Sequence, residues 1–189
     1  LYAYWRSSAS YRVRIALNHK RIAYNLVTAN ITKGEQSTPE HLARNPSGYV
    51  PALVLSAGGR EHCFYESVAI LELLDELFPN PRLYPEDPFL RARVRAVVEI
   101  VNSGIQPLQN LNVLTKVSED PDVRGAWAKH FNQRGLASLE RALTALEADG
   151  IKGPFAFGET LTAADVCIVP QVYSARRLAI DIAAYPRVA

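Results

Sequence analysis

The sequence predicts a two-domain protein, with a small α/β domain followed by an all-helical domain. Three observations in the 189 residues support this division. Before residue 80, short apolar runs alternate with amphipathic segments in the order βαβαββα. Residues 83–88 carry two prolines and two acids, which is typical of a linker. Beyond them the apolar residues follow helical spacing, so we place the domains at residues 1–80 and 86–189.

The elements of the first domain follow from local signals. Residues 1–5 and 22–27 predict two strands, and Ser7 and Ser8 are start signals for a helix between them. Residues 38–42 predict a short helix with proline in its first turn. Residues 50–55 and 61–65 predict a hairpin around Gly58 and Gly59. A helix from Ser67 is ended by Pro79 and Pro81, and one apolar face is expected to hold Ile70, Leu71, Leu74, Leu77 and Phe78.

The second domain reads as three helices. Residues 89–117 predict one long helix that Pro107 bends, because proline removes a backbone hydrogen bond. Residues 123–146 predict the next helix. The third starts at Thr162, where Asp165 completes a capping box in which Asp replaces the usual Glu or Gln.

Composition limits the functional classes. Apolar residues make up 48% of the chain and charged residues 21%, as in an ordinary globular protein. The 21 basic and 19 acidic residues leave a formal charge of +2, so we expect neither nucleic acid nor a membrane as partner. The two cysteines and four histidines show no metal-ligand spacing, and we expect no metal and a reduced, cytoplasmic protein. The chain lacks methionine and an obvious final helix, so we expect that it is truncated at the C-terminus.

Three short motifs could carry chemistry, and each has a plainer alternative. Residues 6–12 join a strand to a helix. The free N–H groups and serine hydroxyls at the start of this helix suit an anion, and the alternative is that a serine simply caps the helix. Val50 precedes Pro51, which would expose the backbone of Val50 to a peptide if the bond were cis, although trans bonds are commoner. Glu66 suits an ammonium and Ser67 a carboxylate, the two charges on an amino acid α-carbon, and here too a plain cap is the alternative.

Taken together, these motifs resemble the zeta-class glutathione transferase and maleylacetoacetate isomerase family. The signature of that class is Ser-Ser-Cys-x-[aromatic or His]-Arg-Val-Arg-Ile-Ala-Leu, and residues 7–17 read Ser-Ser-Ala-Ser-Tyr-Arg-Val-Arg-Ile-Ala-Leu. Residues 45–46, 50–51, 66–70, 104–111 and 169–172 agree as well. The resemblance covers nearly the whole chain. It implies a thioredoxin-like N-terminal domain with an all-α C-terminal domain (the glutathione transferase fold), glutathione as cofactor, and a homodimer.

The resemblance also implies a role for individual residues. Ser7 would face the glutathione sulfur with Ser8 beside it, and Val50 would pair with the cysteinyl backbone, which makes Pro51 cis. The remaining contacts to glutathione would come from Arg12, Gln36, Glu66, Ser67, Gln106 and Asn110, with Gln36 at the glycyl end and Glu66 and Ser67 at the γ-glutamyl end. Arg6 and Arg177 would bind substrate carboxylates, although a solvated helix face is the alternative for Arg177. Ala9 departs from the signature, which has cysteine there.

The implied reaction is a glutathione-dependent cis–trans isomerisation of maleylacetoacetate, in which a thiolate adds reversibly to the double bond of a small diacid. A maleylpyruvate isomerase or a general zeta-class transferase is the alternative within enzymes. A binding module that retains the fold without catalysis is the alternative from another class, because fold does not prove activity.

Overall fold

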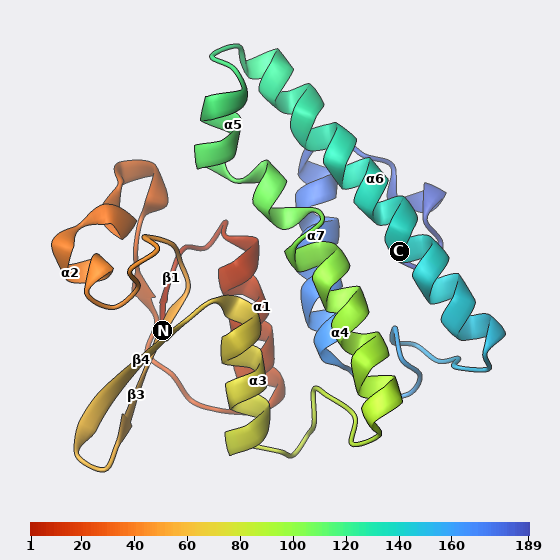
Figure 1. Cartoon of the computed structure of the whole chain (residues 1–189), viewed down its shortest axis with the longest axis horizontal. Coiled ribbons are helices and arrows are strands. Elements are labelled where there is room, and N and C mark those ends of the chain that lie inside the picture. The colour runs from red at the N-terminus through yellow and green to blue at the C-terminus, as the bar shows by residue number, and fades with distance from the viewer. The chain divides into compact units, whose positions relative to one another are not determined.

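The computed structural model describes all residues, 1–189, and divides them into two compact units, Leu1–Leu83 and Tyr84–Ala189 (Figure 1). The first unit contains the strands and three helices, and the second is helical. None of the helices combines the length and the apolarity that crossing a membrane needs.

The first unit is built on a four-stranded sheet of order β2-β1-β3-β4. Strand β1 (Tyr2–Ala3) pairs parallel to β2 (Val27–Thr28) and antiparallel to β3 (Ala52–Ala57), and β3 pairs antiparallel to β4 (Arg60–Tyr65). The helices are α1 (Ser8–His19), α2 (Pro39–Leu42) and α3 (Ser67–Leu77), with two 3₁₀ turns, η1 (Ile31–Lys33) and η2 (Glu35–Ser37), before α2. Helices α1 and α3 pack side by side (Figure 1). The predicted order βαβαββα is confirmed.

Local turn chemistry explains the predicted hairpin. Gly58 and Gly59 have φ angles of 59° and 74° and join β3 to β4 as a two-residue loop. Two positive φ angles define the type I′ turn, which glycine accepts without steric cost. The hairpin prediction is therefore confirmed, with its strands shifted by one or two residues.

Two expectations for the first unit are wrong in detail. The second strand is only β2, because the N–H of Ile22 bonds to the carbonyl of Leu17 and closes the end of α1 instead of joining the sheet. Leu77 and Phe78 are 53% and 42% exposed and do not join the core. The C-terminal end of α3 lies next to the charged side chain of Lys20, the C-cap of α1. The Nζ of Lys20 donates a hydrogen bond to the carbonyl of Phe78.

The second unit consists of α4 (Pro88–Asn102), η3 (Gln106–Gln109), α5 (Leu111–Val117), α6 (Pro121–Ala148), α7 (Ala163–Arg177) and η4 (Ile182–Ala184). Helix α4 packs against both α6 and α7. The start of α7 is as predicted, because the carboxylate of Asp165 accepts hydrogen bonds from the backbone N–H of Thr162 at 2.8 Å and from its hydroxyl at 2.9 Å.

The single long helix expected over residues 89–117 is wrong. The chain leaves the helix at Ser103 and continues as η3 and α5, so it is interrupted rather than bent. Pro107 explains the break, because its ring has no N–H and would clash with the carbonyl four residues earlier, at Ser103, where α4 ends. Asn110 then adopts an extended conformation, with ψ of 146°, before α5 begins.

Candidate active site

Ser7 occupies the N-cap of α1. Its Oγ accepts a hydrogen bond from the backbone N–H of Ser10 at 3.1 Å, and its own N–H donates to the carbonyl of Tyr4 at 3.0 Å. The capping interpretation is therefore correct, but it does not exclude a functional one. A hydroxyl that accepts one hydrogen bond still has its proton to donate, and the helix dipole favours an anion at this end. The cap orients the hydroxyl, and its proton remains available to a bound anion.

Ser8 and Ala9 form the first turn of α1, and both are half-buried. The backbone N–H groups of a first helical turn have no partner within the helix, so this turn adds donors beside the Ser7 hydroxyl. Ser10 is fully buried, and its Oγ accepts the N–H of Tyr4 at 3.4 Å. That bond fixes the connection between β1 and α1. Ala9 brings no polar side chain to the turn.

Glu66 has a backbone conformation that the sequence does not predict. It is exposed at the N-cap of α3 and has φ of 64° and ψ of 114°. A residue other than glycine costs about 1–3 kcal/mol in such a region, and strained residues of this kind cluster at active sites and ligand clamps. The conformation marks the start of α3 as a candidate binding position.

Arg12 is fully buried and lies beneath the start of α3. Its Nη1 donates a hydrogen bond to Oγ of Ser67 at 3.0 Å, and Ser67 itself is only 4% exposed. A residue with this placement orients Ser67 and joins α1 to α3. The structure therefore places Arg12 behind the expected binding surface and not on it.

Val50 and Gln36 both lie between β2 and β3. The peptide bond between Val50 and Pro51 is cis, as the resemblance implies, and Val50 is 8% exposed in a cluster with Tyr4 and Ala29. Gln36 belongs to η2, and its buried Oε1 accepts no hydrogen bond. A buried acceptor without a donor is costly, so this oxygen suits a donor from a ligand.

The sheet topology brings several of these residues to one edge. Because β3 runs antiparallel to β1 and β4 antiparallel to β3, the end of β1, the start of β3 and the end of β4 lie along the same edge. Ser7 follows β1, Val50 precedes β3, and Glu66 and Ser67 follow β4. The predicted anion site and the predicted amino acid site therefore share one edge of one sheet.

Arg6 also belongs to the connection after β1. It is exposed, and its Cζ lies 5.6 Å from the ring centroid of Trp5, which is 62% exposed. A guanidinium beside an aromatic ring gains cation–π stabilisation and still presents donors to a carboxylate.

The second unit holds the other three predicted residues. Nε2 of Gln106 donates to Oδ1 of Asn110 at 2.9 Å, so these two side chains bracket η3. Arg177 is exposed in the last turn of α7, next to Arg176, which is also exposed.

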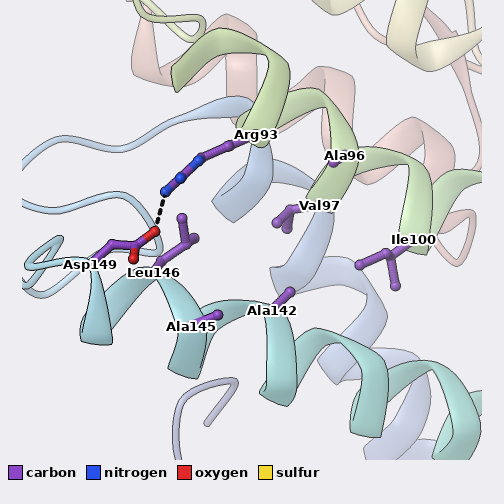
Figure 2. A pocket seen from close by; sticks show the side chains of 8 residues that line it. All are labelled: Arg93, Ala96, Val97, Ile100, Ala142, Ala145, Leu146 and Asp149. Atoms are coloured by element: carbon purple, nitrogen blue, oxygen red, sulfur yellow. Dashed lines mark hydrogen bonds and ion pairs between the residues drawn. The ribbon is translucent and has the colours of Figure 1, made fainter. Parts of the chain in front are cut away.

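A groove of about 260 Å³ lies between α4 and α6 of the second unit (Figure 2). Figure 2 shows small and apolar side chains along it, and Arg93 and Asp149 form an ion pair of 2.6 Å at one end. None of the predicted site residues lines this groove, and its two charged groups pair with each other. The groove therefore has no free group for chemistry.

Family comparisons agree with this fold. Residues 1–82 match the model for the glutathione S-transferase N-terminal domain, and residues 129–189 match that for the C-terminal domain. A probable maleylacetoacetate isomerase 2 of Drosophila melanogaster is 44% identical over 98% of this chain and 78% of its own length. A zeta-class glutathione S-transferase of Euphorbia esula is 42% identical over 98% of this chain and 80% of its own length.

Solved structures give the same result. A maleylacetoacetate isomerase of Anaeromyxobacter dehalogenans 2CP-1, with bound dicarboxyethyl glutathione and citrate in the active site, has a TM-score of 0.87 and 43% identity. The match includes the whole of this chain and 81% of the length of that protein. A bacterial zeta-class maleyl pyruvate isomerase has a TM-score of 0.90 and 37% identity, over 99% of this chain and 87% of its own. Both units thus have the glutathione transferase fold. The chain belongs to the zeta-class glutathione transferase and maleylacetoacetate isomerase family.

Proposed function

We propose that this protein is a glutathione-dependent cis–trans isomerase that converts maleylacetoacetate to fumarylacetoacetate. The observation that carries the proposal is the shared edge of the sheet. The Ser7 hydroxyl at the start of α1 lies along the same edge as Val50, Glu66 and Ser67. Relatives named maleylacetoacetate isomerase at 44% and 42% identity support the choice of reaction.

The residues of the first unit fit glutathione. The exposed carboxylate of Glu66 suits the ammonium of the γ-glutamyl end, and Ser67 with the N–H groups of α3 suits its carboxylate. The backbone N–H and C=O of Val50 suit the cysteinyl peptide, and the unsatisfied Oε1 of Gln36 suits a donor near the glycyl end. Gln106 and Asn110 of the second unit complete the proposed set.

Bound glutathione supplies a thiolate that adds reversibly to the conjugated double bond and so permits rotation about a single bond. An ordinary cysteine thiol has a pKa of about 8.5, so the protein must favour its ionised form at neutral pH. The hydroxyl of Ser7, the adjacent Ser8 and the N-terminus of α1 supply hydrogen bonds and partial positive charge for this purpose. Ala9 is compatible with this assignment, because the sulfur comes from glutathione.

Arg6 and Arg177 are the proposed partners of the two substrate carboxylates. A guanidinium binds a carboxylate through two parallel hydrogen bonds, and its charge also stabilises the negative charge that develops during the reaction. The citrate in the active site of the Anaeromyxobacter relative supports a pocket for multiply carboxylated ligands.

Absorbance-monitored isomerisation of maleylacetone and maleylpyruvate, with and without glutathione, tests the proposal. We expect turnover only with glutathione and faster turnover of maleylacetone. Faster turnover of maleylpyruvate would favour the second candidate, a maleylpyruvate isomerase, which the TM-score of 0.90 to such an enzyme supports. Absence of turnover on both substrates, with glutathione still bound, would leave a general transferase or a binding module.

We also propose a homodimer in the cytoplasm. The support for the dimer is membership in the family, and the exposed free thiol of Cys63 suits a reducing compartment. Sedimentation equilibrium should give a particle of twice the mass of the chain. A particle of one chain mass across micromolar concentrations would refute the dimer.

A further inference from the structure

Three carboxamide side chains of the second unit form a closed ring of hydrogen bonds. Gln171 Nε2 donates to Asn132 Oδ1 at 2.5 Å, and Asn132 Nδ2 donates to Gln109 Oε1 at 2.8 Å. Gln109 Nε2 closes the ring by donating to Gln171 Oε1 at 3.3 Å. The three residues come from η3, α6 and α7, so the ring joins three elements that are distant in sequence.

The direction of the ring is fixed by the backbone. Asn132 Nδ2 also donates to the carbonyl of Ala128 at 2.7 Å, so the nitrogen of this amide must point that way and its oxygen must accept from Gln171. Asn132 thereby uses both of its donors, and both Asn132 and Gln171 are fully buried. Opening the ring would leave buried polar atoms without partners, which is costly in a medium of low dielectric.

The 3₁₀ turn η3 depends on α6 for its position. Its own backbone bonds are few, and a single turn does not hold itself. Trp127 Nε1 of α6 donates to the carbonyl of Leu108 at 3.0 Å. Gly135 of α6 lies against Ile105, and a Cβ at this position would overlap the Ile105 side chain. The amide ring adds the link from this assembly to α7.

Two of the joined elements carry proposed site residues. Gln106 and Asn110 bracket η3, and Gln171 lies six residues before Arg177 in α7. We propose that Gln109, Asn132 and Gln171 are positioning residues. Their ring holds Arg177 in a fixed register for the diacid and the Gln106–Asn110 pair in a fixed register for glutathione. The part that concerns these two ligands rests on the proposed function.

Steady-state kinetics of the whole chain tests the ring through leucine substitutions. Asn132→Leu and Gln171→Leu should each raise KM for the diacid about tenfold and change kcat less than about threefold. The double variant should raise KM no more than either single variant, because one substitution already opens the ring. Leu143→Ala, a buried substitution in α6 that leaves the ring intact, should lower the melting temperature without changing KM. Gln109→Leu, at the half-buried member, gives the same test if the buried variants fold poorly.

Amide hydrogen exchange provides a readout that needs no substrate. Opening the ring should speed exchange of the backbone amides of residue 106 and residues 108–110 by about tenfold or more, while the β3–β4 hairpin exchanges as before. Unchanged exchange at residues 106–110, additive effects in the double variant, or an equal KM change in Leu143→Ala would overturn the proposal. Absence of turnover in the unmodified chain would refute the proposed function alone, since exchange still tests the ring.

Discussion

Arg12 Nη1 donates a hydrogen bond of 3.0 Å to Ser67 Oγ, and this bond joins two helices whose N-termini both belong to the candidate active site. The guanidinium is fully buried in α1, and Ser67 is the first residue of α3. Ser7 lies at the start of α1, so the bond couples the proposed thiolate end of glutathione to its γ-glutamyl end. The relationship makes Arg12 a positioning residue rather than a ligand contact.

A double-mutant cycle tests this role. Arg12→Met should weaken glutathione binding about five- to tenfold, because Ser67 loses the hydrogen bond that orients it. In the Ser67→Ala background the same substitution should have little further effect on the glutathione Kd. Isothermal titration calorimetry of the four proteins measures the coupling.

The control is Arg12→Lys, which keeps the charge but not the planar guanidinium and should restore little of the affinity. Independent, additive losses in the cycle would show that Arg12 acts on glutathione by another route.

Ser7→Ala should affect turnover much more than glutathione affinity. We expect kcat to fall about 100-fold, the scale of a lost donor to a developing or ionised charge. The glutathione Kd should change less than about fivefold, the value of one ordinary hydrogen bond. The cap to the Ser10 N–H is also lost, which should lower the free energy of unfolding by about 1 kcal/mol.

Asp120→Ala separates these two consequences. Asp120 caps α6 by accepting the N–H of Asp122 at 2.8 Å and lies outside the proposed site. This variant should lose similar stability at unchanged kcat. Turnover of Ser7→Ala equal to that of the unmodified chain would remove Ser7 from the chemistry.

The parts of the fold that the sequence predicts are those with local causes. The glycine pair of the β3–β4 hairpin and the Thr162–Asp165 cap act within a few residues, so each can be recognised in the sequence. Pro107 is visible in the sequence as a disruption of residues 89–117, but the separate turn η3 was not predicted, because its position depends on Trp127 and Gly135 in another helix.

In the candidate site, too, the residues with local signals could be predicted and the effects of distant packing could not. Ser7, Glu66 and Ser67 stand at helix starts and could be identified by type and position. The positive φ of Glu66 and the burial of Arg12 beneath Ser67 had no sequence signal, since both depend on how α1 and α3 pack. The amide ring was missed for this reason as well: its members lie up to 62 residues apart.

Breaking the buried ion pair between Lys20 and Asp75 by removing one partner should strongly destabilise the first unit. Lys20 Nζ bonds to Asp75 Oδ1 at 2.8 Å and to the carbonyls of Phe78 and Pro81 at 2.7 Å each, and its side chain is 0% exposed. Lys20→Met or Asp75→Leu alone should lower the free energy of unfolding by about 3–5 kcal/mol, because one charge remains buried without its partner.

Urea denaturation of the single and double variants measures this effect. The double variant should be less destabilised than the sum of the singles. The control is removal of the ion pair between Arg93 and Asp149, whose side chains are each about half exposed. Its loss should lower the free energy of unfolding by about 0–1 kcal/mol. A loss of less than about 1 kcal/mol in both Lys20→Met and Asp75→Leu would contradict the assignment.

The imidazole of His19 should titrate below its ordinary range. Burial, and then the neighbouring Lys20 ammonium, lower its pKa from 6.5. A group with a lowered pKa in the folded state stabilises the fold above the unfolded pKa, and this contribution is lost as the pH falls through and below 6.5. NMR titration of the ring protons should give a midpoint below 6.5, and His19→Gln should reduce the loss of stability between pH 7 and pH 5.5. A midpoint at or above 6.5 would show that the imidazolium is stabilised by a partner.

Arg177→Ala should distinguish substrate recognition from a solvated helix face. If the guanidinium binds a substrate carboxylate, its loss should raise KM for a diacid about 10- to 100-fold, the value of a charge-assisted hydrogen bond. A neutral halide substrate lacks the carboxylate, so its KM should change less than about twofold. Arg176→Ala is the matched control, because Arg176 is also an exposed arginine in the same turn of α7. KM measured for both substrates at two ionic strengths separates a specific contact from general attraction, since salt weakens the latter over distances of about 10 Å. Equal effects of Arg177→Ala on both substrates, or equal effects of Arg176→Ala and Arg177→Ala on the diacid, would assign this end of α7 to solvent and leave Arg6 as the proposed carboxylate partner.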